Sequence, residues 1–66
     1  MLKTVDGKRI KVGMWTQDTT GIYKVTSISA REVDLVEVYF IDDKGGYILT
    51  DERKLTPAEA CKLYSF

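Results

Sequence analysis

Residues 33–49 form the most apolar part of the chain. They read Val33-Asp34-Leu35-Val36-Glu37-Val38-Tyr39-Phe40-Ile41, then Asp42-Asp43-Lys44-Gly45-Gly46, then Tyr47-Ile48-Leu49. β-branched and aromatic residues are enriched in strands, and two such runs joined by a short segment with glycines are typical of a β-hairpin. We therefore expect this hairpin to form the core of the protein.

The register of the hairpin predicts two apolar faces. A three-residue loop over residues 43–45, with Gly45 left-handed, sets Phe40 opposite Ile48. Side chains alternate between the two faces along each strand. One face then places Phe40 in the core beside Val36, Val38 and Ile48, and the second face collects Leu35, Tyr39, Ile41, Tyr47 and Leu49.

The second apolar face needs a cover, since an antiparallel sheet with one solvated face carries polar residues there. The sequence leaves two alternatives open. Either the C-terminal helix or the N-terminal segment folds over Leu35, Tyr39, Ile41, Tyr47 and Leu49, or these five residues form a protein-binding or self-association patch.

The chain before the hairpin indicates further strands. Residues 1–12 form either an N-terminal hairpin, with Asp6-Gly7 as a two-residue turn, or a frayed start followed by one strand from Ile10. Tyr23 and Val25 share one face of a strand over residues 21–28. A bulge near Thr26-Ser27 would bring Ile28 back to the core side.

The C-terminal segment carries a helix-start signal. Thr56 suits the N-cap, Pro57 suits the first helical position, and Glu59 stands three residues after the cap, which is a capping box. We expect a helix that runs to about Tyr64, within residues 56–65, with Cys61 on its core-facing side.

Three phrases of the sequence carry a resemblance to a known fold. Val12-Gly13-Met14-Trp15, then Gly21-x-Tyr23-x-Val25-x-x-Ile28, then Val36-x-Val38-x-Phe40, resemble a small SH3-like barrel over roughly residues 10 to 55. The resemblance implies a binding role, with peptides, nucleic acid or other domains as ligands. The acidic loop with a Trp-Trp or Pro-x-x-Tyr cluster of peptide-binding SH3 domains is missing, and so is the Lys-Gly-Asp signature of ribosomal-type barrels.

The composition argues against enzymatic chemistry. The 66 residues form one domain, with no histidine and one cysteine, so the commonest general base and zinc ligand are missing. The adjacent carboxylates Asp42-Asp43 and Asp51-Glu52 have no motif to converge with. We expect no catalytic residue, cofactor or metal. The lack of an apolar N-terminal run and of disulfide pairs predicts a cytoplasmic protein without a membrane segment.

Charge is distributed unevenly although its sum is zero. Residues 1–24 hold five basic against two acidic residues, a net charge of +3, whereas residues 31–52 hold two against seven, a net charge of −5. A basic cluster close to aromatic residues can bind single-stranded nucleic acid, but nucleic-acid-binding domains usually show an overall basic excess. The candidate residues for such a site are Lys8, Arg9, Lys11 and Lys24.

These observations predict a mostly β fold: a small antiparallel SH3-like partial barrel of four to five strands over residues 12–55, with a short C-terminal α-helix. The expected function is a non-enzymatic interaction module that docks an unidentified protein partner or a copy of itself. The alternative is a nucleic-acid-binding accessory domain. The small size and the lack of a catalytic motif suit a protein encoded by a phage or mobile element.

Overall fold

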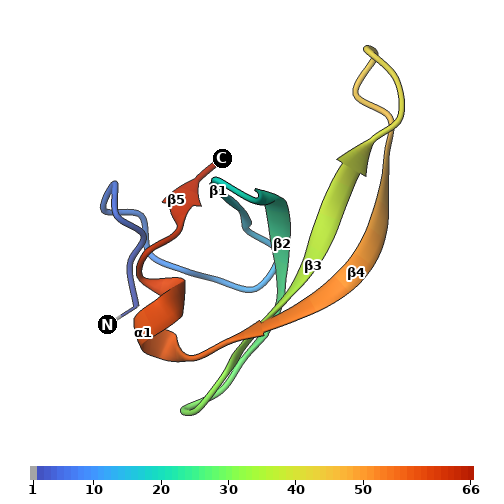
Figure 1. Ribbon diagram of the computed structural model, residues 1–66. Coiled ribbons are helices and arrows are strands. Elements are labelled where there is room, and N and C mark those ends of the chain that lie inside the picture. The colour runs from blue at the N-terminus through green and yellow to red at the C-terminus, as the bar shows by residue number, and fades with distance from the viewer. Residues whose placement is uncertain (1) are drawn as a thin grey trace.

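A single antiparallel sheet makes up most of the structure, a computed structural model that describes residues 2–66 (Figure 1). Its five strands have the order β4-β3-β2-β1-β5. The elements are β1 (Trp15–Asp18), β2 (Gly21–Ile28), β3 (Val33–Phe40), β4 (Tyr47–Leu55), α1 (Pro57–Ala60) and β5 (Tyr64–Ser65). The predicted mostly β, antiparallel domain with a short C-terminal helix is confirmed.

The sheet is open. Strands β4 and β5 are its two edges, and within residues 2–66 they do not pair with each other. The distal part of β3 and β4 projects from the rest of the protein as an arm (Figure 1). No helix in this described range is long and apolar enough to cross a membrane.

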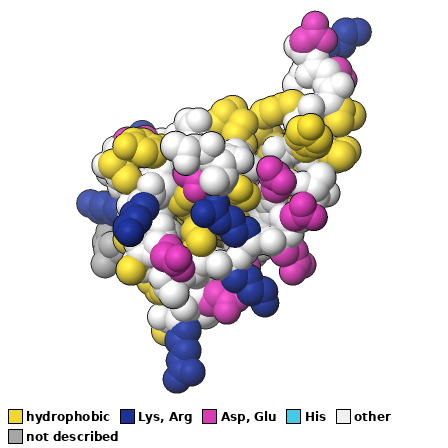
Figure 2. Space-filling view, viewed as in Figure 1, with side chains coloured by type: hydrophobic (Ala, Val, Ile, Leu, Met, Phe, Trp, Pro, Cys, Tyr) yellow, Lys and Arg dark blue, Asp and Glu magenta, His cyan; other side chains and the backbone are white. Residues whose placement is uncertain are grey.

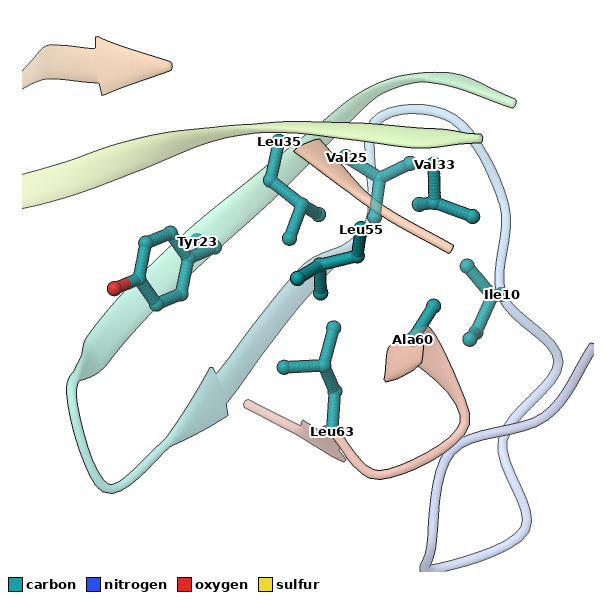
Figure 3. Close-up of a cluster of buried hydrophobic side chains, with 8 residues drawn as sticks. All are labelled: Ile10, Tyr23, Val25, Val33, Leu35, Leu55, Ala60 and Leu63. Atoms are coloured by element: carbon teal, nitrogen blue, oxygen red, sulfur yellow. The ribbon is translucent and has the colours of Figure 1, made fainter. Parts of the chain in front are cut away.

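The core lies on one face of the sheet, where the N- and C-terminal segments pack against it (Figure 3). Val25, Val33 and Leu35 from the central strands are almost fully buried. The complete cluster comprises Ile10, Tyr23, Val25, Val33, Leu35, Leu55, Ala60 and Leu63. The predicted bulge in β2 is confirmed between Val25 and Ser27, and Ile28 packs against the core as expected.

The N-terminal segment forms a short hairpin, which decides between the two alternatives. The Thr4 N–H donates to the Lys8 carbonyl at 2.8 Å, and Lys3 forms a bridge with Arg9. The turn spans the three residues 5–7 rather than two, with Gly7 at a φ of 84°. The Thr4 hydroxyl stabilises this wider turn, because it accepts a hydrogen bond from the Lys8 N–H at 3.0 Å.

The C-terminal helix starts as predicted but is much shorter. The Thr56 side chain accepts from the Glu59 N–H at 3.2 Å, and the Glu59 carboxylate accepts from the Thr56 N–H at 2.9 Å, so the capping box is confirmed. The helix ends at Ala60, and the expectation that it reaches Tyr64 is wrong. Leu63 is buried in the core, and the following residues instead form β5, which pairs with β1.

Next to the loop, the register of β3 and β4 differs by one residue from the prediction. The Ile41 N–H donates to the Gly46 carbonyl at 3.0 Å, so the loop holds four residues, and Phe40 lies opposite Tyr47. Asp42 stabilises this longer loop by accepting from the N–H groups of Lys44 and Gly46. This shift moves the side chains of residues 47–49 to the other face, and a bulge opposite Glu37 restores the expected register from Glu52 to Leu55. The expected core position of Phe40 is also wrong, since its side chain is 40% exposed.

Candidate protein-binding surface on the distal hairpin

Large apolar side chains remain exposed along the projecting arm of β3 and β4. Figure 2 shows hydrophobic side chains gathered on this arm, next to its charged tip. We call these six residues the distal surface: Tyr39, Phe40, Ile41, Tyr47, Ile48 and Leu49, each between 40% and 63% exposed. Monomeric proteins rarely expose apolar side chains as a contiguous group without a role in binding.

The distal surface wraps around both faces of the arm. Tyr39 pairs with Ile48, whereas Phe40 pairs with Tyr47, and paired residues of an antiparallel sheet point to the same face. Leu49 lies on the Phe40 face because it is two residues from Tyr47. The arm is therefore apolar on each side, and neither face is the polar one that a one-sided sheet would show.

The structure brings together only part of the predicted patch. Leu35 is buried in the core, with 1% of its surface exposed, so its assignment to the patch is wrong. Tyr39, Ile41, Tyr47 and Leu49 are exposed, but Tyr39 and Tyr47 lie on opposite faces. The C-terminal helix does not hide them, because it ends at Ala60.

Sequence reasoning assigned Phe40 and Ile48 to the core and so missed them. The signal that could have placed them is Asp42. An aspartate at the start of a loop accepts hydrogen bonds from backbone N–H groups further along, which favours the four-residue loop. With that loop, the correct register puts Ile48 beside Tyr39.

An aromatic cluster supports one face of the distal surface. The Trp15 ring lies 4.9 Å from the Tyr47 ring, 5.9 Å from the Phe40 ring and 5.8 Å from the Phe66 ring, centroid to centroid. Aromatic pairs at such separations attract each other. Phe66 is held in place because its N–H donates to the Trp15 carbonyl at 3.1 Å. The cluster therefore joins the arm to β1 and to the C-terminal residue.

The two edges of the sheet differ in how they are covered. At β5, Asp6 accepts hydrogen bonds from both the hydroxyl and the N–H of Ser65. Just before β5, the Val5 N–H donates to the Leu63 carbonyl at 2.8 Å. At β4, residues 47–55 make no backbone hydrogen bond to any part of the described chain except β3. The β5 edge is thus covered and the β4 edge is open.

Carboxylates flank the distal surface. Asp43 lies at the tip of the arm, and Asp51 and Glu52 follow the apolar part of β4; all three are exposed. Within residues 2–66, the ion pairs are Arg53 with Asp18 at 2.8 Å and Lys54 with Glu32 at 3.6 Å. Neither pair involves the three flanking carboxylates, so their charges are available to a ligand.

A groove of about 750 Å³ lies away from the arm, between the end of β1, the end of β4 and the C-terminal segment. Its carboxylates are already engaged. Hydrogen bonds from the Ser65 hydroxyl, the Thr4 hydroxyl and the Ser65 N–H hold the pKa of Asp6 well below its usual range. Partial burial raises the pKa of Asp18. Hydrogen bonds from Thr20 and Arg53 together lower this pKa by more than burial raises it, so the net change is downward.

The carboxylates of the groove are not matched to the role of a general acid near neutral pH. Hydrogen bonds from the backbone and side chain of Thr56 also lower the pKa of Glu59, the third carboxylate of the groove. A carboxyl group that acts as a general acid near neutral pH needs a raised pKa. The groove does not supply one from these three residues.

The predicted basic residues lie in two places. Lys8, Arg9 and Lys11 are exposed on the N-terminal segment, whereas Lys24 is half-buried on β2, opposite Trp15. None of the four forms an ion pair with a described carboxylate. Residues 2–66 also contain no group of three or more side chains that could hold a metal ion.

Comparison of the chain with protein-family models, with curated proteins and with solved structures finds no match.

Proposed function

We propose that this protein is a non-enzymatic interaction module that docks a partner protein through the distal surface. The observation that carries the proposal is the exposure of six large apolar side chains on one projecting arm. Each of them lies beside the unpaired β4 edge or one strand away from it. Apolar area in contact with water is unfavourable, and burying it is the main driving force of protein association.

We also propose that the open sheet is an SH3-like partial barrel. The strands β1 to β4 follow one another as a meander, and β5 turns back to pair with β1. This return adds β5 to the β1 edge, and full closure into a barrel would require the two edge strands, β4 and β5, to pair. The remaining opening lies between β5 and β4, which leaves the β4 edge free for a ligand.

The docking proposal can be tested with a pair of exposure-matched substitutions. Tyr39 is 63% exposed on the arm and Val12 is 62% exposed on the N-terminal segment. Immobilised wild type, Tyr39→Lys, Leu49→Lys and Val12→Lys would be used to capture proteins from an extract of the source cells. A captured protein is then purified and titrated by calorimetry against each variant whose circular dichroism matches the wild type.

We expect Tyr39→Lys and Leu49→Lys to weaken binding by about tenfold or more, because truncation or charge at an interface hot spot typically costs over 1 kcal/mol. Val12→Lys should bind like the wild type. Equal binding by all four proteins would refute docking at the distal surface. Sedimentation velocity tests whether the partner is a second copy of this chain. A wild-type dimer that Leu49→Lys converts to a monomer would identify the partner as a second copy.

Single-stranded nucleic acid is the second candidate ligand. The observation that favours it is the position of Lys24, which lies opposite Trp15 on the face that carries the aromatic cluster. Aromatic rings with nearby cations bind bases by stacking and phosphates by charge. Titration of a labelled oligonucleotide at low salt tests this idea. Binding that weakens with salt and is lost in Lys24→Glu would support it, and no binding at tens of micromolar would exclude it.

A further inference from the structure

We propose that the partner contributes an extended segment that adds as a new strand to the outer edge of β4 at Tyr47–Leu49. The segment has a central run of about three apolar residues with lysine or arginine on both sides. This inference rests on the proposed function, and it specifies the geometry and the chemistry of the bound segment.

The two edges of the sheet differ in the backbone groups that they leave free. An open edge strand presents unpaired N–H and C=O groups to any extended chain. The N-terminal turn covers β5 through Asp6 and binds Leu63 just before it through Val5, whereas β4 keeps its outer groups free within the described residues. Strand addition at β4 therefore satisfies backbone groups, and the same addition at β5 would first have to displace the Asp6 contacts.

The side chains define where on β4 the segment binds. Ile48 lies on one face of the arm, and Tyr47 and Leu49 lie on the other. A strand beside them would place its own residues next to apolar neighbours on both faces, so it needs consecutive apolar residues rather than an alternating pattern. Thr50 and Asp51 stand opposite the single residue Glu37 of β3, as the register shows. This bulge interrupts the ladder and limits regular pairing to the three residues before it.

The charges define the flanks of the segment. Asp51 and Glu52 follow the apolar part of β4, and Asp43 precedes it in the loop. These carboxylates have no ion-pair partner among residues 2–66. Lys44 is the one basic residue between positions 32 and 52, where seven residues are acidic. Complementary charge orients and selects a ligand, so the segment is expected to be basic at both ends.

The test uses the full chain, labelled with ¹⁵N, and a blocked seven-residue peptide with three central valines and two lysines on each side. Three variants of the peptide are compared with it. The first replaces the lysines with glutamates, the second carries an N-methyl group on the middle valine, and the third carries N-methyl groups on the two outer valines. Alternate N–H groups of an added strand point toward β4, so only one of the two methylation patterns should block pairing.

We expect the lysine peptide, at up to about 1 mM, to shift the amide signals of residues 47–49. The glutamate peptide and one of the two methylated peptides should bind about tenfold more weakly or worse. The variant carrying both Asp51→Lys and Glu52→Lys should prefer the glutamate peptide, while Lys11→Glu, on the N-terminal segment, should behave like the wild type.

Several results would overturn the inference. The proposed segment, apolar in the centre and basic at both ends, would be refuted if the lysine peptide shifts no signal. Equal binding of the lysine and glutamate peptides would also refute it. Equal binding of both methylated peptides and their parent would exclude strand addition. The variant-dependent capture described above reports independently on the proposed function, so docking at the distal surface could still stand after any of these results.

Discussion

The two halves of the β3–β4 hairpin both carry large apolar residues, but only the proximal half buries them. In the proximal half, Val33 and Leu35 are almost completely buried, and Leu55 covers them from β4. In the distal half, Tyr39 and Ile48 have comparable apolar character and are exposed. The difference comes from the segments that reach them. Ile10, Ala60 and Leu63 pack on the proximal half only, so burial depends on distant parts of the chain as well as on the strand pattern.

The largest expected effect tests the proximal half. Leu35→Ala should lower the free energy of unfolding by about 2–5 kcal/mol, because the substitution leaves a cavity in the core. Leu49→Ala removes the same atoms from the exposed distal half and should cost less than about 1 kcal/mol. Urea denaturation followed by circular dichroism measures both. Similar losses for the two variants would contradict the distinction between the halves.

A smaller effect is expected where the distal half touches the rest of the protein. Phe40→Ala should cost about 1–2 kcal/mol, since aromatic pairs such as those with Trp15 and Tyr47 contribute about 0.5–1.5 kcal/mol each. Tyr39→Ala is the control, because Tyr39 packs against no other described aromatic ring. Denaturation should separate the two variants, and Trp15 fluorescence should change in Phe40→Ala alone. An equal cost would mean that the aromatic cluster adds no stability.

The N-cap of α1 provides a test of the C-terminal segment that packs on the proximal half. Thr56→Ala removes the side chain that accepts the Glu59 N–H and should cost about 1 kcal/mol. For a domain of this size, that loss lowers the melting temperature by roughly 4–8 °C. Thr56→Ser keeps the hydroxyl and should melt near the wild type. A loss as large in Thr56→Ser as in Thr56→Ala would show that the hydroxyl is not the cause.

The smallest expected effect concerns the covered β5 edge and appears as a pH dependence. Hydrogen bonds from the Ser65 hydroxyl and the Thr4 hydroxyl lower the pKa of Asp6 in the folded state. A lowered pKa stabilises the fold above the ordinary value of about 3.9, and this stabilisation is lost as pH falls toward the folded-state pKa. Melting temperatures between about pH 7 and pH 2 measure it.

Asp6→Asn is the matching variant for the pH experiment. The amide keeps the size of the side chain and removes its titration. We expect the wild type to lose more stability than Asp6→Asn as the pH falls below about 4. Parallel curves for the two proteins would contradict the role assigned to Asp6.

Local signals in the sequence predicted local structure well. The Thr56–Glu59 capping box and the bulge after Val25 depend on neighbouring residues, and both are confirmed. The face of β3 that becomes the core was predicted wrongly, because Ile10, Ala60 and Leu63 pack on the face of Val33 and Leu35. One extra residue in the loop after Ile41 also reverses the side chains of residues 47–49. The helix length was also wrong, since burial of Leu63 and pairing of β5 with β1 are long-range effects.

For the candidate site, composition indicated an apolar surface on the hairpin but could not divide it between core and solvent. Leu35 and Tyr39 lie on the same face of β3 by the period of two, yet one is buried and the other exposed. Only the positions of Ile10, Ala60 and Leu63 separate them. The sequence pattern also did not predict that β4 is an open edge, because the position of a strand in the sheet depends on which other strands pair with it.

The contact between Asp6 and Ser65 has a consequence for the order of folding. These residues are 59 positions apart in the chain, whereas the strands β1 to β4 pair with their immediate neighbours. Closing a long loop costs more chain entropy than closing a short hairpin, and non-local contacts slow folding. We therefore expect the four-stranded meander to assemble first and the two chain ends to join it last, so that a transiently opened molecule would release its ends while the meander persists.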